Sequence, residues 1–129
     1  MRELKSYSYA VVRVVPNVER DEFVNAGVIV YSQERRYLAA KVMLHEKRLR
    51  ALAPRVDMAE VRRHLETVPR ICAGDATAGP IAKLGLGERF HWLTAPRSTM
   101  IQVSPVRTGI CDEPEKLLLK LMEEMVGGG

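Results

Sequence analysis

Three closely spaced apolar segments near the N-terminus constrain the fold of this chain most. The first, "SYSYAVVRVVP" (residues 6–16), is rich in β-branched and aromatic side chains that alternate along the two-residue period of a strand. The second and third, "AGVIVYS" (26–32) and "YLAAKVML" (37–44), follow after a polar connection and a short turn. Because strands joined by short links pair antiparallel, the sequence predicts a three-stranded meander.

From residue 45 onward the apolar spacing becomes helical. A short helix over residues 46–52 ends before Pro54, and a second helix opens at Asp57, with Glu60 three residues later as its capping partner. We expect Pro69 to end this second helix, because the residue before a proline avoids the helical region. Its buried stripe consists of Met58, Val61, Leu65 and Val68.

The rest of the chain is expected to add a loop, a strand and a final helix. Residues 73–80 have the composition of a loop, residues 81–94 are expected to be irregular and then extended, and residues 98–106 alternate as a strand does. Residues 112–126 form a helix that Asp112 caps. Its core face is formed by Leu118, Leu121, Met122 and Met125.

These elements predict an α+β fold, in which an antiparallel sheet of four to five strands carries two to three helices packed on one face. A chain of 129 residues with 47% hydrophobic and 28% charged residues is the size of one ordinary domain. We therefore expect a single domain over residues 1–126 and a flexible glycine tail over residues 127–129.

The composition also bears on the cellular location. No apolar run approaches the roughly 20 residues that span a membrane, and the N-terminus lacks the cleavage site of a secretory signal. We therefore expect a cytoplasmic protein that does not contact a membrane. In a reducing cytosol, Cys72 and Cys111 are expected to be free thiols.

The excess positive charge lies in the middle of the sequence. The net charge is +4, and residues 35–70 hold ten Lys and Arg against four Asp and Glu. Two interpretations are open, namely a solvated helix face or a contact surface for an acidic partner or nucleic acid. The basic patch in question comprises Lys47, Arg48, Arg50, Arg62 and Arg63.

The sequence lacks the common catalytic and cofactor motifs. Ser98 lies in "PRST", without the flanking glycines of a nucleophile elbow. The three histidines form no pair with metal-ligand spacing. Gly85 and Gly87 lack the other positions of a dinucleotide or P-loop signature. We expect no catalytic residue, no metal and no cofactor.

Residues 90–109, "FHWLTAPRSTMIQVSPVRTG", are the strongest candidate for a binding segment. Arg97 offers a rigid fork of donors beside a hydroxyl-rich turn, which suits a carboxylate or phosphate. Extended geometry places Gln102 and Ser104 on one face and Arg97 and Arg107 on the other, so only a bend unites them. The structural alternative is that these arginines pair with turn carboxylates such as Glu22.

Our hypothesis is that residues 19–25, "ERDEFVN", and residues 95–105, "APRSTMIQVSP", converge to form a polar recognition surface. Within a helical turn, Glu22 and Asn25 could point together because they are three residues apart. The candidate binding residues are Arg97, Ser98, Gln102, Ser104, Arg107, Glu22 and Asn25.

The segments at residues 7–31 and 90–109, followed by a helix with an acidic cap, resemble a bacterial family of small uncharacterised proteins. That family is catalogued as domain of unknown function three thousand and thirty-seven. Genes of such proteins often lie beside a HipA-like kinase, so the resemblance implies a partner or regulatory subunit in a toxin–antitoxin-like context. The matching positions are Tyr9, Arg13, Pro16, Glu22, Phe23, Asn25, Gly27, Val28, Leu93, Arg97, Ser98, Gln102, Ser104 and Gly109.

The favoured function is a non-enzymatic binding or regulatory module that docks on a partner protein, for which a HipA-like kinase is the candidate. One alternative is a nucleic-acid-binding protein that uses the basic region 35–70, although Tyr37 is its only aromatic residue. Another alternative is a small phosphate-directed enzyme that uses Arg97 and Arg107, with Glu22 as its base.

Overall fold

A single antiparallel sheet organises the structure, a computed structural model that describes residues 3–97 and 99–127 apart from the side chain of Val18. Within these residues the sheet has five strands in the order β3-β2-β1-β4, and β5 pairs with β1 beyond the end of β4. This confirms the predicted α+β class and antiparallel sheet. The strands are β1 (Lys5–Asn17), β2 (Glu22–Ser32), β3 (Tyr37–Val42), β4 (Ile101–Val103) and β5 (Arg107–Cys111).

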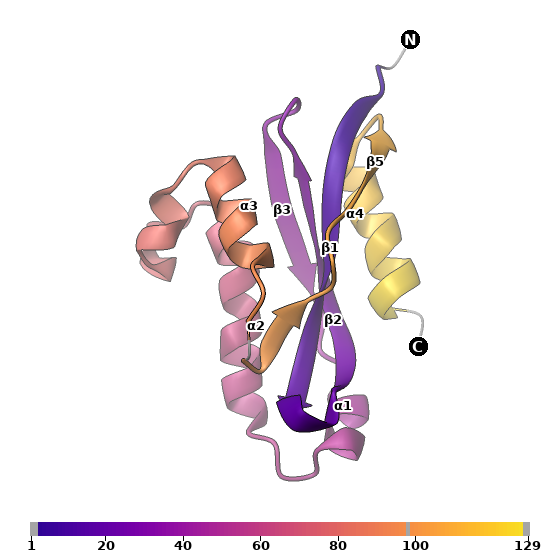
Figure 1. The fold of residues 1–129 in the computed structure, drawn as a ribbon, viewed down its shortest axis with the longest axis vertical. Helices are drawn as coiled ribbons and strands as arrows, with labels where there is room; N and C mark the ends of the chain where they lie inside the picture. The colour runs from indigo at the N-terminus through magenta and orange to yellow at the C-terminus, as the bar shows by residue number, and fades with distance from the viewer. Residues whose placement is uncertain (1–2, 98, 128–129) are drawn as a thin grey trace.

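Helices cover both faces of this sheet. Figure 1 shows α2 and α3 on one side of the strands and α4 on the other. The prediction of two to three helices on one face is therefore corrected to four α-helices on two faces within the described chain. The helices are α1 (Glu46–Leu52), α2 (Met58–Cys72), α3 (Leu86–Thr94) and α4 (Pro114–Met122), and a π-helical turn over Glu123–Gly127 continues α4.

The alternation along β2 explains why both faces need a cover. Ile29 points into the main core, between the sheet and α2 and α3, whereas Val28 and Val30 point to the opposite face against α4. All three side chains are fully buried. A strand that is apolar on both sides must be covered on both sides, because apolar surface left in water is unfavourable.

The predicted buried positions of the helix at the main core are confirmed, but its predicted C-terminal end is wrong. The Asp57 side chain caps α2 by accepting from the Glu60 backbone N–H at 3.1 Å, and all four residues of the predicted stripe are buried. Pro69 does not end α2, which continues to Cys72. Proline removes one helical hydrogen bond, and here packing of Ile71 and Cys72 into the core favours continuation.

Several further segments differ from expectation. The strand expected over residues 98–106 is limited to Ile101–Val103, and the last helix begins at Pro114 with Glu113 instead of Asp112 at its N-cap and without a side-chain cap. β2 begins at Glu22, four residues earlier than predicted, because pairing with β1 extends to Asn17 opposite Glu22. Residues 86–94 form α3 instead of an extended segment. Burial of Phe90 and Leu93 on one side of α3 outweighs the two glycines near its start.

A β-bulge in β2 places polar residues next to each other. Val12 of β1 lies opposite Gly27, but Arg13 lies opposite Asn25, so Ala26 is the extra residue. On the other edge of β1, Arg13 lies opposite Gln102 of β4. The register therefore forms a row of three polar residues across three strands.

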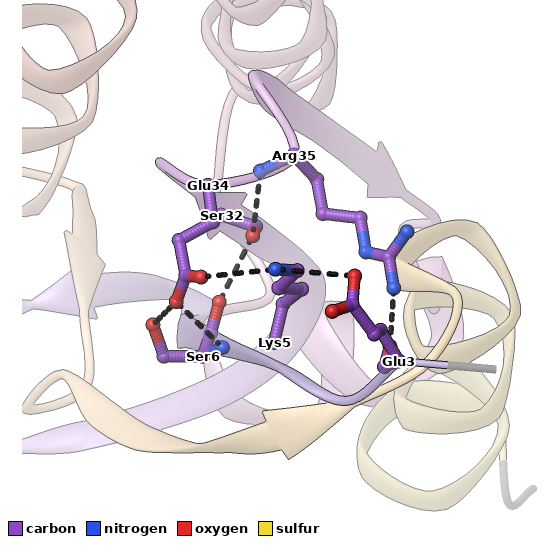
Figure 2. A network of polar contacts seen from close by, with 6 residues as sticks. All are labelled: Glu3, Lys5, Ser6, Ser32, Glu34 and Arg35. Atoms are coloured by element: carbon purple, nitrogen blue, oxygen red, sulfur yellow. Dashed lines mark hydrogen bonds and ion pairs between the residues drawn. The ribbon is translucent and has the colours of Figure 1, made fainter.

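The far end of the sheet is closed by a polar network between the start of β1 and the turn after β2 (Figure 2). Ser6 donates through its Oγ to Glu34 Oε1 at 2.9 Å, and Ser32 Oγ donates to the Ser6 carbonyl at 2.9 Å. Hydrogen bonds from Ser6 lower the pKa of the exposed Glu34 carboxyl. Lys5 lies 3.6 Å from the same carboxylate. Because these groups satisfy one another, the network serves to fix the turn.

Two findings concern the extent of the fold. Gly127 belongs to the final helical turn, and the remainder of the predicted glycine tail lies outside the described residues. Across the part of the chain that the structure describes, no helix is long and apolar enough to cross a membrane.

Substituting Gly27 tests the close approach of β2 and β3. A Cβ at this position would lie 2.6 Å from the Lys41 carbonyl oxygen and 2.9 Å from Val42 Cγ1. We expect Gly27→Ala to lower the free energy of unfolding by roughly 1–3 kcal/mol through overpacking. Urea denaturation of the purified variant would measure this loss.

Gly85→Ala is the matched control for this experiment. Gly85 has an ordinary φ of −65°, and the closest atom to an added Cβ is Glu88 Oε1 at 3.5 Å. We expect its stability to lie within about 0.5 kcal/mol of wild type. Equal stabilities of the two variants would contradict the steric account of Gly27.

Candidate functional site

Arg97 lies just after α3 with its guanidinium stacked on the indole of Trp92, 4.0 Å from the ring centroid. Its Nη2 donates to the Trp92 carbonyl oxygen. No carboxylate of the described residues forms an ion pair with Arg97, whereas Glu22, the proposed structural partner, pairs with Arg20 Nε at 2.6 Å. Partial burial lowers the pKa of Arg97 below its ordinary value.

Arg97 borders two hollows at the edge of the sheet. The first, which we call the Trp92 groove, has a volume of about 500 Å³ and lies between α2, α3 and β4. The second, the edge hollow, has a volume of about 380 Å³ and is also lined by Gln102 and Ser104. The Trp92 groove is lined by Glu60, His64, Thr67, Val68, Ile71, Trp92, Leu93, Arg97, Thr99, Met100 and Ile101.

The Trp92 groove has an apolar floor and a polar rim. Val68 and Leu93 of the floor are buried core residues, whereas the Trp92 side chain is 39% exposed. On the rim, His64 Nε2 lies 3.6 Å from Glu60 Oε1. Tryptophan and arginine are among the residue types enriched at the energetic centres of protein interfaces.

A buried arginine fixes the helix that carries Trp92. Arg89 Nη1 donates to the carbonyl oxygens of Ile71 at 3.0 Å and Cys72 at 2.8 Å, at the C-terminus of α2. These carbonyls lack helical partners, and a positive charge is favourable at a helix C-terminus. Arg89 is thus a positioning residue that clamps α3 to α2.

The row of polar residues across the sheet lies beside the edge hollow. Arg13 stands between Asn25 of β2 and Gln102 of β4 and stacks on Phe23 at 4.1 Å. The Asn25 Nδ2 donates to the Met125 carbonyl at 3.1 Å, and Gln102 Nε2 donates to the Thr99 carbonyl at 2.9 Å. Asn25 and Gln102, from the two segments predicted to converge, are therefore two strands apart, about 10 Å.

The other predicted binding residues lie elsewhere. Arg107 is exposed on β5, opposite Tyr9, whereas Glu22 lies opposite Asn17 and lines a separate hollow of about 470 Å³. Eight residues of β1 separate those two register positions, a span of about 26 Å. Glu22 and Arg107 therefore do not act on one small substrate together. Ser98 lies outside the described residues.

Ser104 has a structural position in the gap between β4 and β5. Its Oγ accepts from the buried Val11 N–H at 2.8 Å, and its own N–H donates to the Val11 carbonyl at 2.9 Å. The Ser104 hydroxyl thus accepts the β1 hydrogen bond that the backbone of a paired strand would otherwise accept. Ser104 is 7% exposed, so its hydroxyl is largely withdrawn from the edge hollow.

The basic patch lies on α1 and α2 and faces solvent. Lys47, Arg48, Arg50 and Arg63 are exposed. Arg62 Nε donates to Glu46 Oε2 at 3.1 Å, and this contact raises the pKa of Arg62. Part of the positive charge is therefore paired within the chain.

The cysteines and the acidic residues bear on possible chemistry. Burial raises the pKa of Cys72 to about 12, so the thiol is protonated at neutral pH, and Cys111 is a half-buried free thiol. Within residues 3–97 and 99–127, no three His, Cys, Asp or Glu side chains come close enough to share a metal ion.

Sequence reasoning missed two residues of this site, Trp92 and Arg13. The sequence predicts Trp92 on an extended segment, although Arg89 and Trp92, three residues apart, fit one turn of a helix. Arg13 is the one charged residue in the apolar segment of residues 6–16, and this position could have indicated a functional role. Its neighbours in space could not be known before the bulge set the register.

The fold and site define a class of protein: an α+β domain with a groove at the edge of its sheet. The chain belongs to the family described as protein of unknown function (DUF3037), whose model matches residues 9–126. Comparison with curated proteins and with solved structures produced no match.

Ser104→Ala tests the structural role of this hydroxyl. The variant leaves the buried Val11 N–H without its acceptor, and an unsatisfied buried donor costs roughly 1–3 kcal/mol of stability. Urea denaturation measures this change. The exposed Thr108 on β5 provides the control, since Thr108→Ala should lie within about 0.5 kcal/mol of wild type. Wild-type stability of Ser104→Ala would contradict this role.

Thiol labelling tests the burial of Cys72. In the Cys111→Ser variant at pH 8, we expect an aromatic disulfide reagent to label Cys72 only as fast as the protein unfolds, because the thiol is buried and its pKa is about 12. Denaturant should make labelling rapid. Fast labelling of the native variant would show that Cys72 is accessible.

Proposed function

We propose that the protein is a non-enzymatic binding module that recognises a partner protein through Arg97 and the Trp92 groove. The observation that supports this most directly is the state of Arg97. Its guanidinium is partly withdrawn from water and stacked on Trp92, and no carboxylate in the described part of the chain pairs with it. A partly desolvated cation without a carboxylate partner favours an acidic group from outside.

The chemistry of the groove suggests what the partner presents. One Nη2 hydrogen of Arg97 is used on the Trp92 carbonyl, and the remaining N–H donors of the stacked guanidinium suit a carboxylate. The apolar floor next to it, which includes Leu93 and Ile101, suits an aliphatic or aromatic side chain. A partner segment with an acidic residue close to an apolar one would satisfy both.

The surroundings of one possible nucleophile, Cys72, and of the candidate base, Glu22, support a non-enzymatic role. The thiol of Cys72 is buried with a raised pKa. Glu22, the base in the alternative enzymatic hypothesis, is paired with Arg20 and remote from Arg107. The notion of a regulatory subunit comes from the family resemblance, which makes a HipA-like kinase the first partner to test.

The experiment is a comparison of tagged wild type and Arg97→Ala as baits in an extract of the native host, followed by quantitative mass spectrometry. We expect one partner to be recovered at least about tenfold less with Arg97→Ala, since a central interface arginine contributes about 2 kcal/mol or more. Co-expression with the host's HipA-like kinase tests that candidate directly. Trp92→Ala should reduce recovery of the same partner.

Arg107→Ala is the matched control, because Arg107 is an exposed arginine on the same sheet but outside both hollows. It should recover the partner as wild type does. Thermal unfolding of each bait checks that the variants are folded. Equal recovery of every protein by wild type and Arg97→Ala would contradict the proposal.

A further inference from the structure

Arg13 is a second arginine that stacks on an aromatic ring. The guanidinium lies 4.1 Å above the Phe23 ring, and no carboxylate among residues 3–97 and 99–127 forms an ion pair with it. Its Nε is buried and unpartnered. A buried guanidinium nitrogen without an acceptor is unfavourable, because removal from water is not compensated.

The neighbours of Arg13 extend this donor surface. Asn25 and Gln102 flank it on the two adjacent strands, each about 5 Å away across the ladder. Each uses one amide hydrogen on a carbonyl of the chain, namely that of Met125 or Thr99. An amide nitrogen carries two hydrogens, so each side chain retains a further donor, while the Asn25 Oδ1 acceptor is buried without a partner.

Stacking determines how a ligand can approach. The Phe23 ring, itself 42% exposed, covers one face of the guanidinium, and because Nε is buried, a ligand meets the group through its two Nη atoms. A planar fork of this kind matches the oxygens of a carboxylate or phosphate, and the flanking amides can complete the coordination.

We infer that Arg13, flanked by Asn25 and Gln102, forms an oxyanion-binding site on the sheet that is separate from the Trp92 groove. The ligand group is a carboxylate or a phosphate. Gln102 lines the edge hollow together with Arg97, and it lies opposite Arg13 in the ladder between β1 and β4. The inference concerns the Arg13 site alone and does not require the partner proposed for Arg97.

Nuclear magnetic resonance of the ¹⁵N-labelled full chain tests this site. The Nε–Hε signal of Arg13 and the side-chain amides of Asn25 and Gln102 are followed during titration with inorganic phosphate and, separately, with acetate. Sodium chloride at matched ionic strength serves as the reference. We expect saturating shifts with at least one of the two anions and only small, linear changes with chloride. Saturation by phosphate alone identifies a phosphate source, and saturation by acetate identifies a carboxylate source.

Matched variants separate this site from the others. Arg13→Gln should abolish the shifts of Asn25 and Gln102, and Arg13→Lys, which keeps the charge but loses the fork, should weaken binding several-fold. Arg107→Gln and Arg97→Ala should leave the Arg13 response unchanged. The inference is overturned if the wild-type Arg13 signal moves no more than that of the exposed Arg107, or if Arg97→Ala abolishes the response.

Discussion

The structure depends on β1, which forms hydrogen-bonded ladders along both of its edges. β2 pairs with one edge, and β4 and β5 share the other. Backbone N–H and C=O groups must be paired when they are buried, so a central strand can be apolar only if both neighbours are present. Where β4 ends before β5 begins, the Ser104 hydroxyl takes over as the acceptor for Val11. The two halves of the sequence are joined at this strand.

The same strand organises the polar surface. The bulge at Ala26 brings Asn25 opposite Arg13, and pairing with β4 brings Gln102 to its other side. Without the extra residue, the two-residue alternation would place Asn25 on the opposite face from Arg13. A polar row of three residues that are up to 89 positions apart is therefore a product of register.

Two arginines stacked on aromatic rings are the main candidate ligand-binding groups of this domain. Arg97 lies over Trp92 and Arg13 lies over Phe23, at 4.0 and 4.1 Å from the ring centroids. Stacking orients a guanidinium and shields one face, while its N–H edge stays available for hydrogen bonds. By contrast, the arginines of α1 and α2 are exposed, and Arg62 is paired with Glu46. Net charge alone does not distinguish these two groups of arginines.

An element could be predicted from the sequence where the interactions that determine it act between residues close together in the chain. Local patterns were sufficient for the α+β class, for α1, for the Asp57 cap and for the buried stripe of α2, since period and capping chemistry act within one or two turns. The early start of β2, α3 and the second covered face depended on partners distant in sequence. The same holds for the candidate site. Arg97 could be proposed as a binding residue from its neighbours in the sequence.

The sequence by itself determined that this chain forms an antiparallel sheet with amphipathic helices, because strand and helix periods are written into the spacing of apolar residues. It also identified Arg97 and Gln102 as residues that could share a site. Only the tertiary structure decided that Trp92 lies beneath Arg97, that Arg13 stands between Asn25 and Gln102, and that Glu22 and Arg107 are far apart. These relations arise from strand register and from the clamp of Arg89 on α2, and neither is encoded in any short segment.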